Sequence, residues 1–345
     1  MRIKDRNIGN NEFPFVIAEI GINHGGNLEV AKNMVLEAFK VGAECIKHQT
    51  HFVEDEMTDE AKDIYPPNAN ESIWDVIANS SLSKDEEISL KNFTEELGMI
   101  YISTPFSRSA ADFLADIDIP AFKIGSGECT NIPLVRHIAN FNKPIILSTG
   151  MQPINNLKKS IHILESSEID YALLECTNLY PSKPDFVSLK GILALKKSFP
   201  KAIIGFSDHS IGPYMAIASV ALGASIIERH FTDSRYREGP DISCSMDPIE
   251  LKIIIEKSRE IFIASNNEKH RSLPEEKVYK FARGSIVADK NLLAGQLIKE
   301  NDIWARRPGN GEIPAEKFDD LLGRRLKKDI KYNTQLKWED FIDEA

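Results

Sequence analysis

The regular alternation of short β-type runs with longer amphipathic segments constrains the fold most strongly. Segments with helical periodicity, such as residues 28–42 and 213–224, separate runs rich in β-branched and aromatic residues. Strands that alternate with helices form parallel sheets. Eight such units within about 265 residues predict a (β/α)₈ TIM barrel rather than an open doubly wound sheet. The eight predicted strands are 15–21, 45–50, 99–104, 121–126, 144–150, 171–177, 202–208 and 225–231.

The sequence changes character after residue 265. Residues 266–283 are polar and charged, which is typical of a linker. Residues 284–345 contain short β-like runs and glycine turns but little helical pattern. The chain is therefore divided into a barrel (1–265), a linker (266–283) and a small domain (284–345). A domain of about 60 residues has a limited core of its own, so we expect it to dock onto the barrel or onto a partner subunit.

An unusually long segment, residues 51–83, separates the second predicted strand from its helix. We call this segment the insert. Loops longer than about 12–15 residues are uncommon in compact domains, and they often carry function. The insert is therefore predicted to act as a lid.

Composition excludes several classes of protein. The net charge of −10 gives no support for nucleic-acid binding, which normally needs a basic face. No apolar run approaches the roughly 20 residues of a membrane-spanning helix, and the N-terminus lacks the apolar core of a signal peptide. These features predict a cytoplasmic protein. The four cysteines are far apart and mostly in apolar runs, so we expect reduced core residues and neither a disulfide framework nor a zinc site.

Polar side chains follow nearly every predicted strand. The active sites of TIM barrels lie at the carboxyl ends of the strands, and alternate side chains of each strand point to the barrel axis. We therefore expect these polar groups to converge at one mouth. They are Glu19, Lys47, Gln49, Thr104, Lys123, Ser126, Glu128, Asn178, Tyr180, Ser207, His209, Glu228 and His230.

Two lysines indicate the charge of the ligand. A single lysine near a strand end is usually a surface residue with an apolar stem. Lys47 and Lys123 both lie in apolar runs and are predicted to point inward, where an ammonium group needs an anion. Short donors accompany them, and the glycines of "KIGSG" allow backbone N–H groups to approach closely. This set favours a phosphate, although it is neither a Walker loop nor a dinucleotide fingerprint. The donors are Thr104, Ser126, Asn178 and Ser207.

Histidines occur in two places that suggest metal binding. A lone histidine at a strand end is more often structural, but His209 and His230 belong to consecutive strands and their rings can lie side by side. Two imidazoles can hold a divalent metal and leave positions open for water and substrate. In "CIKHQTH", His48 is out of phase with Lys47 and is predicted to face a helix, while His51 begins the insert. Neither is predicted to be a ligand.

A set of motifs extends over nearly the whole chain in a fixed order. The motifs are "AEIGINHGGN", "KHQTHFVEDEM", "STPFSR", "FKIGSGE", "LSTGM", "TNLYP", "FSDHS", "ERHFTDS", "GPDISCSMDP" and "RPGNG". In these motifs the chain resembles the bacterial sialic acid synthase family, of the N-acetylneuraminate and legionaminic acid synthase type.

This resemblance implies a TIM barrel followed by an antifreeze-like (SAF) domain in a domain-swapped homodimer. It also implies condensation of phosphoenolpyruvate with N-acetylmannosamine and water, giving N-acetylneuraminate and phosphate. The implied phosphoenolpyruvate contacts are the two lysines and four short donors named above, and the implied metal ligands for Mn²⁺ or Mg²⁺ are His209 and His230. Sugar contacts are implied at Gln49, Asn68, Tyr180, Asp241 and Arg307, and proton-handling carboxylates at Glu19 and Glu128.

Other functions remain open on the sequence. The same barrel and first substrate suit a legionaminic or pseudaminic acid synthase, which takes a 2,4-diacetamido-2,4,6-trideoxy hexose. From a different class, the antifreeze-like segment suits a carbohydrate- or ice-binding protein. Inward lysines, carboxylates and histidines argue against an inert scaffold, because unpaired buried charge lowers stability.

Overall fold

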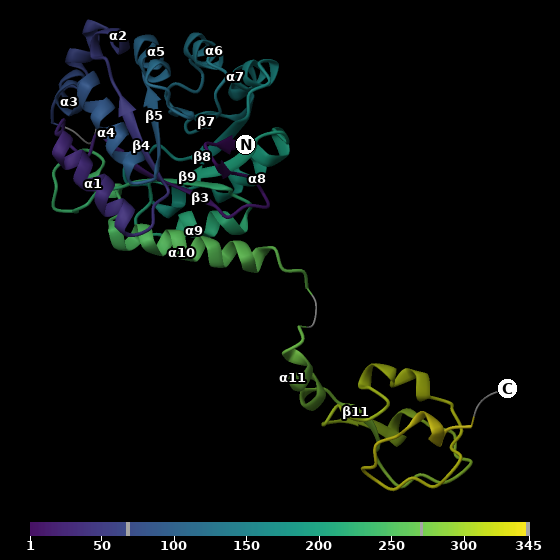
Figure 1. Cartoon of the computed structure of the whole chain (residues 1–345). Helices are drawn as coiled ribbons and strands as arrows, with labels where there is room; N and C mark the ends of the chain where they lie inside the picture. The colour runs from purple at the N-terminus through teal and green to yellow at the C-terminus, as the bar shows by residue number, and fades with distance from the viewer. Residues whose placement is uncertain (67–69, 270–271, 343–345) are drawn as a thin grey trace. The chain divides into compact units, whose positions relative to one another are not determined.

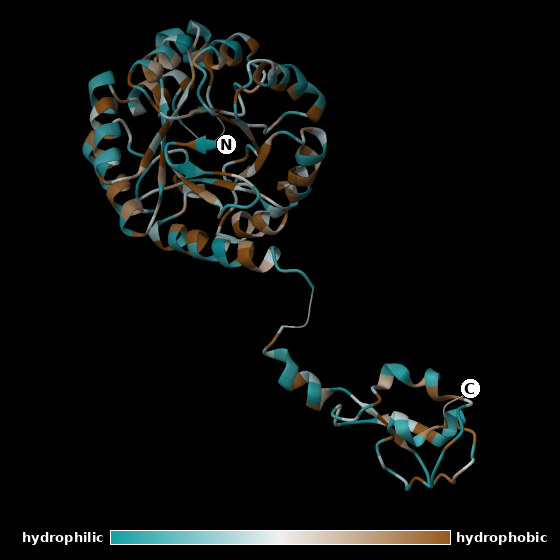
Figure 2. Cartoon of the chain, turned by 45° about the vertical axis from the view of Figure 1, so that its right-hand side comes forward, coloured by the Kyte–Doolittle hydropathy of each residue, from teal (hydrophilic) through white to brown (hydrophobic). Residues whose placement is uncertain are grey.

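The computed structural model describes residues 1–66, 70–269 and 272–342. Its first part is a closed barrel of eight parallel strands surrounded by helices (Figures 1 and 2). The predicted TIM barrel is therefore confirmed. Around the barrel the strands follow chain order, and β10 closes the ring against β3. The strands are β3 (Phe15–Gly21), β4 (Cys45–Thr50), β5 (Ile100–Pro105), β6 (Phe122–Ile124), β7 (Ile145–Ser148), β8 (Tyr171–Cys176), β9 (Ile203–Ser207) and β10 (Ile226–His230).

Helices cover the outer face of the barrel and bury its largest apolar core. Several begin at a side-chain cap, for example α1 at Asn27 and α4 at the capping box of Ser83 and Glu86. The helices of this part are α1 (Leu28–Lys40), α2 (Val53–Glu56), α3 (Ile73–Ser80), α4 (Lys84–Glu96), α5 (Arg108–Asp116), α6 (Ile132–Ala139), α7 (Ile154–Ser166), α8 (Leu189–Ser198), α9 (Tyr214–Ala221) and α10 (Pro248–Ser265), with short 3₁₀ turns η1 (Asp59–Asp63), η2 (Pro184–Phe186) and η3 (Ile242–Cys244).

The inner face of the barrel is apolar at one end and polar at the other. Near the amino ends of the strands, Phe15, Ile17 and Ile102 form part of a separate buried cluster. Ile3 and Ile8 join that cluster from the N-terminal hairpin of β1 (Arg2–Ile3) and β2 (Arg6–Asn7). Because apolar side chains fill this end of the barrel interior, we expect a ligand to enter the barrel at the carboxyl ends of the strands, which we call the mouth.

The insert has its own small core beside the mouth. Ile22, Val53 and Ile77 are buried together, and Ile73 and Trp74 pack against them. The described part of the insert contains α2, η1 and α3, so it includes helical segments as well as irregular loop. Its predicted role as a lid stays a prediction, and Asn68 lies outside the described residues.

Contacts divide the chain between Asn267 and Glu268. In the second unit, α11 (Glu275–Ala282) occupies part of the segment interpreted as a linker, so that segment is partly helical. β11 (Ser285–Ala288) pairs with β12 (Ile303–Arg306) over an apolar core of this unit's own. Four 3₁₀ turns complete it: η4 (Glu300–Asp302), η5 (Ala315–Lys317), η6 (Asp319–Leu321) and η7 (Trp338–Asp340). Among the described residues, none of the helices combines the length and apolar character that a membrane crossing requires.

Candidate active site

Ten of the predicted site residues line a single cavity at the mouth. They come from six different strands or from the segments that follow them. In each of these strands, the inward-pointing residues near the carboxyl end are polar. The ten are Lys47, Gln49, Thr104, Lys123, Ser126, Asn178, Tyr180, Ser207, His209 and His230.

Lys47 is held by a carboxylate and a hydroxyl. Its Nζ lies 2.5 Å from Glu19 Oε2 and donates to Thr104 Oγ1 at 3.2 Å. Gln49 Nε2 donates to the other oxygen, Glu19 Oε1, at 2.8 Å. Burial alone would lower the pKa of Lys47, but Glu19 and Glu228 outweigh it and raise that pKa, so Lys47 stays charged.

Lys123 is less completely paired. Its Nζ donates to Ser148 Oγ at 2.7 Å and lies 3.6 Å from Glu228 Oε1, which accepts a hydrogen bond from Ser207 Oγ at 3.0 Å. Burial lowers the pKa of Lys123 more than Glu228 raises it. An anion bound beside Lys123 would therefore favour its charged form.

A glycine brings two of the predicted phosphate donors together. The Gly150 N–H donates to Ser126 Oγ at 3.1 Å. A Cβ at position 150 would lie 1.8 Å from Asn178 Oδ1 and 2.8 Å from Ser126 Oγ, so no larger residue fits between these side chains. The glycine of "LSTGM" thus shapes the cavity wall.

The two predicted metal ligands lie side by side. The ring centroids of His209 and His230 are 5.3 Å apart, and Tyr180 packs on His209 with its centroid at 4.2 Å. His209 Nδ1 lies 2.8 Å from the Thr177 carbonyl oxygen. Because a carbonyl oxygen can only accept a hydrogen bond, Nδ1 carries the proton. In the neutral ring the lone pair is therefore on Nε2. His230 Nδ1 is buried, has no hydrogen-bond partner among the described residues, and lies 3.7 Å from Asp241 Oδ2.

The surroundings shift the pKa values of the two imidazoles in opposite directions. Burial and the neighbouring His209 lower the pKa of His230 well below its usual value, so His230 is neutral, as a ligand must be. Burial alone would lower the pKa of His209, but Cys176, the Thr177 carbonyl and Asp241 raise it to about 9. The described residues hold no group of three or more acidic, cysteine or histidine side chains arranged for a metal. The side-by-side rings leave room for a cation held by two imidazoles, with water or substrate as its remaining ligands, and its binding would displace one proton from His209.

The other predicted residues lie in different places. Asp241 is partly buried near His230, and this burial raises its pKa to about 6. Glu128 accepts a hydrogen bond from Asn131 Nδ2 at 2.5 Å and lines a neighbouring cavity instead. Arg307 belongs to the second unit, where it is exposed and has no ion pair with a described residue. The roles of Glu128, Arg307 and Asn68 stay predictions.

Three further polar residues line the cavity: Ser148 and Cys176, which were not predicted, and Glu228, which was predicted to lie at the mouth but was given no role. Glu228 had a clear signal, because it shares the inward phase of His230 two residues later on β10. Ser148 and Cys176 share the inward phase of β7 and β8 but look like ordinary residues of apolar strands. Their position next to Lys123 and His209 becomes visible only in three dimensions.

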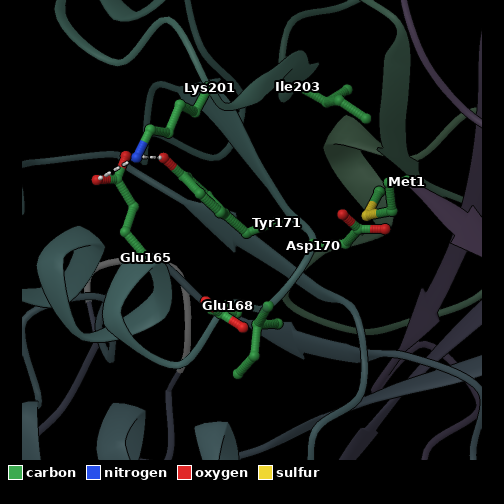
Figure 3. Close-up of a pocket in the computed structure, with 8 residues that line it drawn as sticks. Met1, Glu165, Glu168, Asp170, Tyr171, Lys201 and Ile203 are labelled. Carbon is green, nitrogen blue, oxygen red and sulfur yellow. Dashed lines mark hydrogen bonds and ion pairs between the residues drawn. The ribbon is translucent and has the colours of Figure 1, made fainter.

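Two other features lie away from the mouth. His48 faces α4 as predicted, with Nδ1 3.3 Å from Glu87 Oε1. A hollow at the amino ends of β8 and β9 is lined by Tyr171 and Lys201 among others, and both lie near Glu165 (Figure 3). Because this hollow is at the opposite end of the strands, it is separate from the candidate active site.

Comparison with known proteins identifies relatives over nearly the full chain. The N,N'-diacetyllegionaminic acid synthase of Legionella pneumophila is 34% identical and covers 94% of each chain. Human N-acetylneuraminate-9-phosphate synthase is 30% identical over 95% of this chain and 92% of its own. The crystal structure of an N-acetylneuraminic acid synthetase from Leptospira borgpetersenii matches with a TM-score of 0.73 and 28% identity, covering 81% of this chain and 94% of that one.

Family models match both parts of the chain. Residues 283–342 match the SAF domain. Residues 34–270, which include all but the first strand of the barrel, match the NeuB family. The chain therefore belongs to the NeuB family and carries an SAF domain after its barrel.

Proposed function

We propose that this protein is a nonulosonic acid synthase, which condenses phosphoenolpyruvate with the open-chain aldehyde of an N-acetylated amino sugar and releases phosphate. The observation that carries this proposal is the single cavity that holds two buried lysines, short hydroxyl and amide donors and a pair of histidines. The lysines and the short donors suit an anionic enol phosphate. The histidine pair suits a metal ion that activates a carbonyl group. The relatives' names support the same reaction class.

Binding of phosphoenolpyruvate is assigned to one side of the cavity. Lys47 and Lys123 supply positive charge, and Ser126, Asn178 and Ser207 supply short polar groups around it. The weakly paired Lys123 would gain a second anionic neighbour, which stabilises its ammonium form. Burial of both lysines strengthens these contacts because few water molecules screen them.

The proton transfers are assigned to Glu19. As the methylene carbon of phosphoenolpyruvate bonds to the aldehyde carbon, negative charge develops on the aldehyde oxygen. Water then adds to the former enol carbon and loses a proton to the ionised Glu19, which passes it to that oxygen, and C–O cleavage expels phosphate. Glu19 contacts Lys47 and Gln49 directly, whereas Glu128 lines the next cavity, so Glu19 is the better placed of the two carboxylates.

His209 and His230 would hold the divalent cation, Mn²⁺ or Mg²⁺. When bound, it supplies Lewis-acid polarisation of the aldehyde oxygen. The Thr177 carbonyl orients His209, and Tyr180 packs on its ring. These contacts keep the two imidazoles in place before substrate arrives.

N-acetylmannosamine is the first acceptor we propose, which would make the product N-acetylneuraminate. A 2,4-diacetamido-2,4,6-trideoxy hexose is the second, favoured by the 34% identity to the Legionella synthase. Homodimer formation and a sugar contact from Arg307 remain predictions that accompany either acceptor.

The test is phosphate release from phosphoenolpyruvate with a panel of acceptors, with and without a chelator. The panel contains N-acetylmannosamine, its 6-phosphate and the diacetamido sugar. A large preference for one acceptor names the enzyme. Absence of phosphate release with every acceptor, in a folded and metal-supplied protein, would refute the proposal.

A further inference from the structure

A chain of polar contacts leaves the mouth and ends on the insert. From Glu19, which pairs with Lys47, it passes to Gln49 Nε2 at 2.8 Å. Gln49 Oε1 lies 3.1 Å from His51 Nε2, and His51 Nδ1 lies 2.8 Å from Glu56 Oε2 on α2. His51 is only 5% exposed, so water cannot readily replace these partners.

The positions of the hydrogen atoms in this series of polar contacts follow from which groups can donate and which can only accept. The Glu19 carboxylate pairs with Lys47 and only accepts, so Gln49 must turn its NH₂ group toward Glu19 and its oxygen toward His51. His51 Nε2 must therefore carry a hydrogen. The Glu56 carboxylate also only accepts, so Nδ1 must carry one as well. With both ring nitrogens donating, His51 is an imidazolium cation.

The surroundings of His51 agree with a positive charge. His51 contacts the Glu56 carboxylate from α2. Beyond Gln49 lies the Glu19 carboxylate from β3, whose partner is Lys47. The Phe106 ring stacks on His51 with centroids 4.3 Å apart and offers its π face to a cation. His24, from the segment after β3, adds no opposing charge, because burial and His48 lower its pKa to about 3.

The insert is tied down at the neighbouring residue too. Asp55 Oδ2 accepts from the Ser109 backbone N–H at 2.9 Å and from Ser109 Oγ at 2.7 Å, at the start of α5. This second tie holds α2 to the barrel but does not touch Gln49. His51 is therefore the contact that joins the position of the insert to the side chains of the mouth.

We propose that His51 is a charged positioning residue, which fixes the amide of Gln49 and holds α2 of the insert against the mouth. The functional part rests on the proposed synthase activity, in which Gln49 contacts the acceptor sugar. Without the charge, one of the two hydrogen bonds of His51 is lost. Gln49 is then free to turn, or α2 separates from the mouth. Acceptor binding should suffer more than phosphoenolpyruvate binding, because the lysines keep their own partners.

Nuclear magnetic resonance of protein labelled with ¹⁵N-histidine tests the charge directly. His51→Gln identifies the His51 signals by their loss. At pH 7.5 both ring nitrogens of His51 should be protonated, and Glu56→Gln, which removes the carboxylate partner of Nδ1, should leave only one of them protonated. A neutral His51 ring at pH 7.5 in the wild-type protein would overturn the assignment, whatever reaction the protein catalyses.

Kinetics test the positioning role. His51→Phe keeps an aromatic ring against Phe106 but removes both hydrogen bonds, so the acceptor KM should rise about tenfold while the phosphoenolpyruvate KM stays within about twofold. Glu56→Gln should raise the acceptor KM by a smaller factor that grows with pH. His162→Phe, at an exposed position of α7, is the matched control and should change neither constant.

The resonance and kinetic experiments distinguish a wrong charge assignment, a wrong positioning role and a wrong proposed function. An unchanged acceptor KM in folded His51→Phe, or equal rises in both KM values, would overturn the positioning role. If His51→Phe does not fold, the pH dependence of Glu56→Gln decides instead. If the wild-type protein releases no phosphate, the proposed function fails, while the resonance experiment still decides the charge of His51.

Discussion

Two pairs of histidines in this barrel have similar geometry but different surroundings. The ring centroids of His24 and His48 are 5.2 Å apart, and those of His209 and His230 are 5.3 Å apart. The first pair lies on the outer side of the barrel, where the two Nε2 atoms face each other at 3.1 Å and Glu87 of α4 lies next to His48. The second pair faces the cavity at the mouth.

The difference shows that proximity of two imidazoles does not make a metal site. His24 and His48 use a nitrogen each on one another and are enclosed by other side chains, so no lone pair faces an open space. His209 and His230 leave nitrogens toward a cavity that a cation and a substrate can enter. Access to open space, set by strand phase, distinguishes the two pairs.

The largest effect is expected from removing the mouth pair. His209→Ala or His230→Ala should reduce metal-dependent phosphate release by about 10³-fold or more, because the carbonyl loses its Lewis acid. The measurement is phosphate release with and without chelator. His24→Ala should instead lower the thermal stability while the folded fraction keeps its metal dependence. Full chelator sensitivity in both mouth variants would contradict the assignment of the metal to these histidines.

The next effect concerns the weakly paired lysine of the mouth. Lys123→Met should raise the phosphoenolpyruvate KM at least tenfold, because a charge-assisted contact is lost and Glu228 is left without its lysine. Lys158→Met, at an exposed position of α7, is the matched control. Steady-state kinetics with varied phosphoenolpyruvate measure both. An increase confined to the acceptor KM would move Lys123 out of the phosphate site.

Strand phase explains how much of this site the sequence could predict. Alternation placed Lys47 inward and His48 outward, and both positions are as expected. Strand alternation no longer predicts the direction of a side chain beyond the end of a strand, where the chain turns. Glu128 follows the short strand β6 by four residues and lies in the neighbouring cavity, beyond the reach of a two-residue period.

Specific side-chain pairings were beyond prediction for a different reason. The pairing of Lys123 with Glu228, and of His51 with Glu56, depends on side-chain conformations that no local pattern specifies. The N-terminal hairpin that fills the amino end of the barrel was also missed, because each of its strands has only two residues.

A smaller effect is expected from the network around the outer pair. Glu87 accepts hydrogen bonds from Tyr101 Oη at 2.9 Å and from Thr50 Oγ1 at 2.6 Å. Burial alone would raise the pKa of Glu87, but His48 and these hydroxyls lower it below its usual value. Tyr101→Phe removes one donor and should lower the free energy of unfolding by about 1–2 kcal/mol at pH 7.

Chemical denaturation measures the Tyr101→Phe change, and phosphate release provides the contrast with the mouth. The kcat/KM of Tyr101→Phe should stay within about twofold of the wild type, because Tyr101 lies on the outer face. A tenfold loss of activity at unchanged stability would show that the outer network contributes to catalysis after all.

The smallest effect is expected at Glu175, a carboxylate on the outer side of β8 that lacks the partners of Glu87. A Cβ at Gly191 would lie 2.3 Å from the carboxyl carbon of Glu175, so the side chain packs closely on α8. Glu175 has no hydrogen bond or ion pair with a described residue, and burial raises its pKa from 4.5 to about 7. The folded protein therefore prefers the protonated form, and its stability falls as pH rises from the unfolded value of 4.5 to about 7.

Glu175→Gln removes this titration. The variant should be more stable than the wild type at pH 8 by about 1 kcal/mol, allowing for water at the partly exposed carboxyl, and about equal to it at pH 4.5. Urea denaturation at several pH values measures the difference. A benefit that is independent of pH would mean that packing rather than charge burial limits this position, whereas a benefit confined to high pH confirms that an isolated carboxylate opposes folding where the partnered Glu87 supports it.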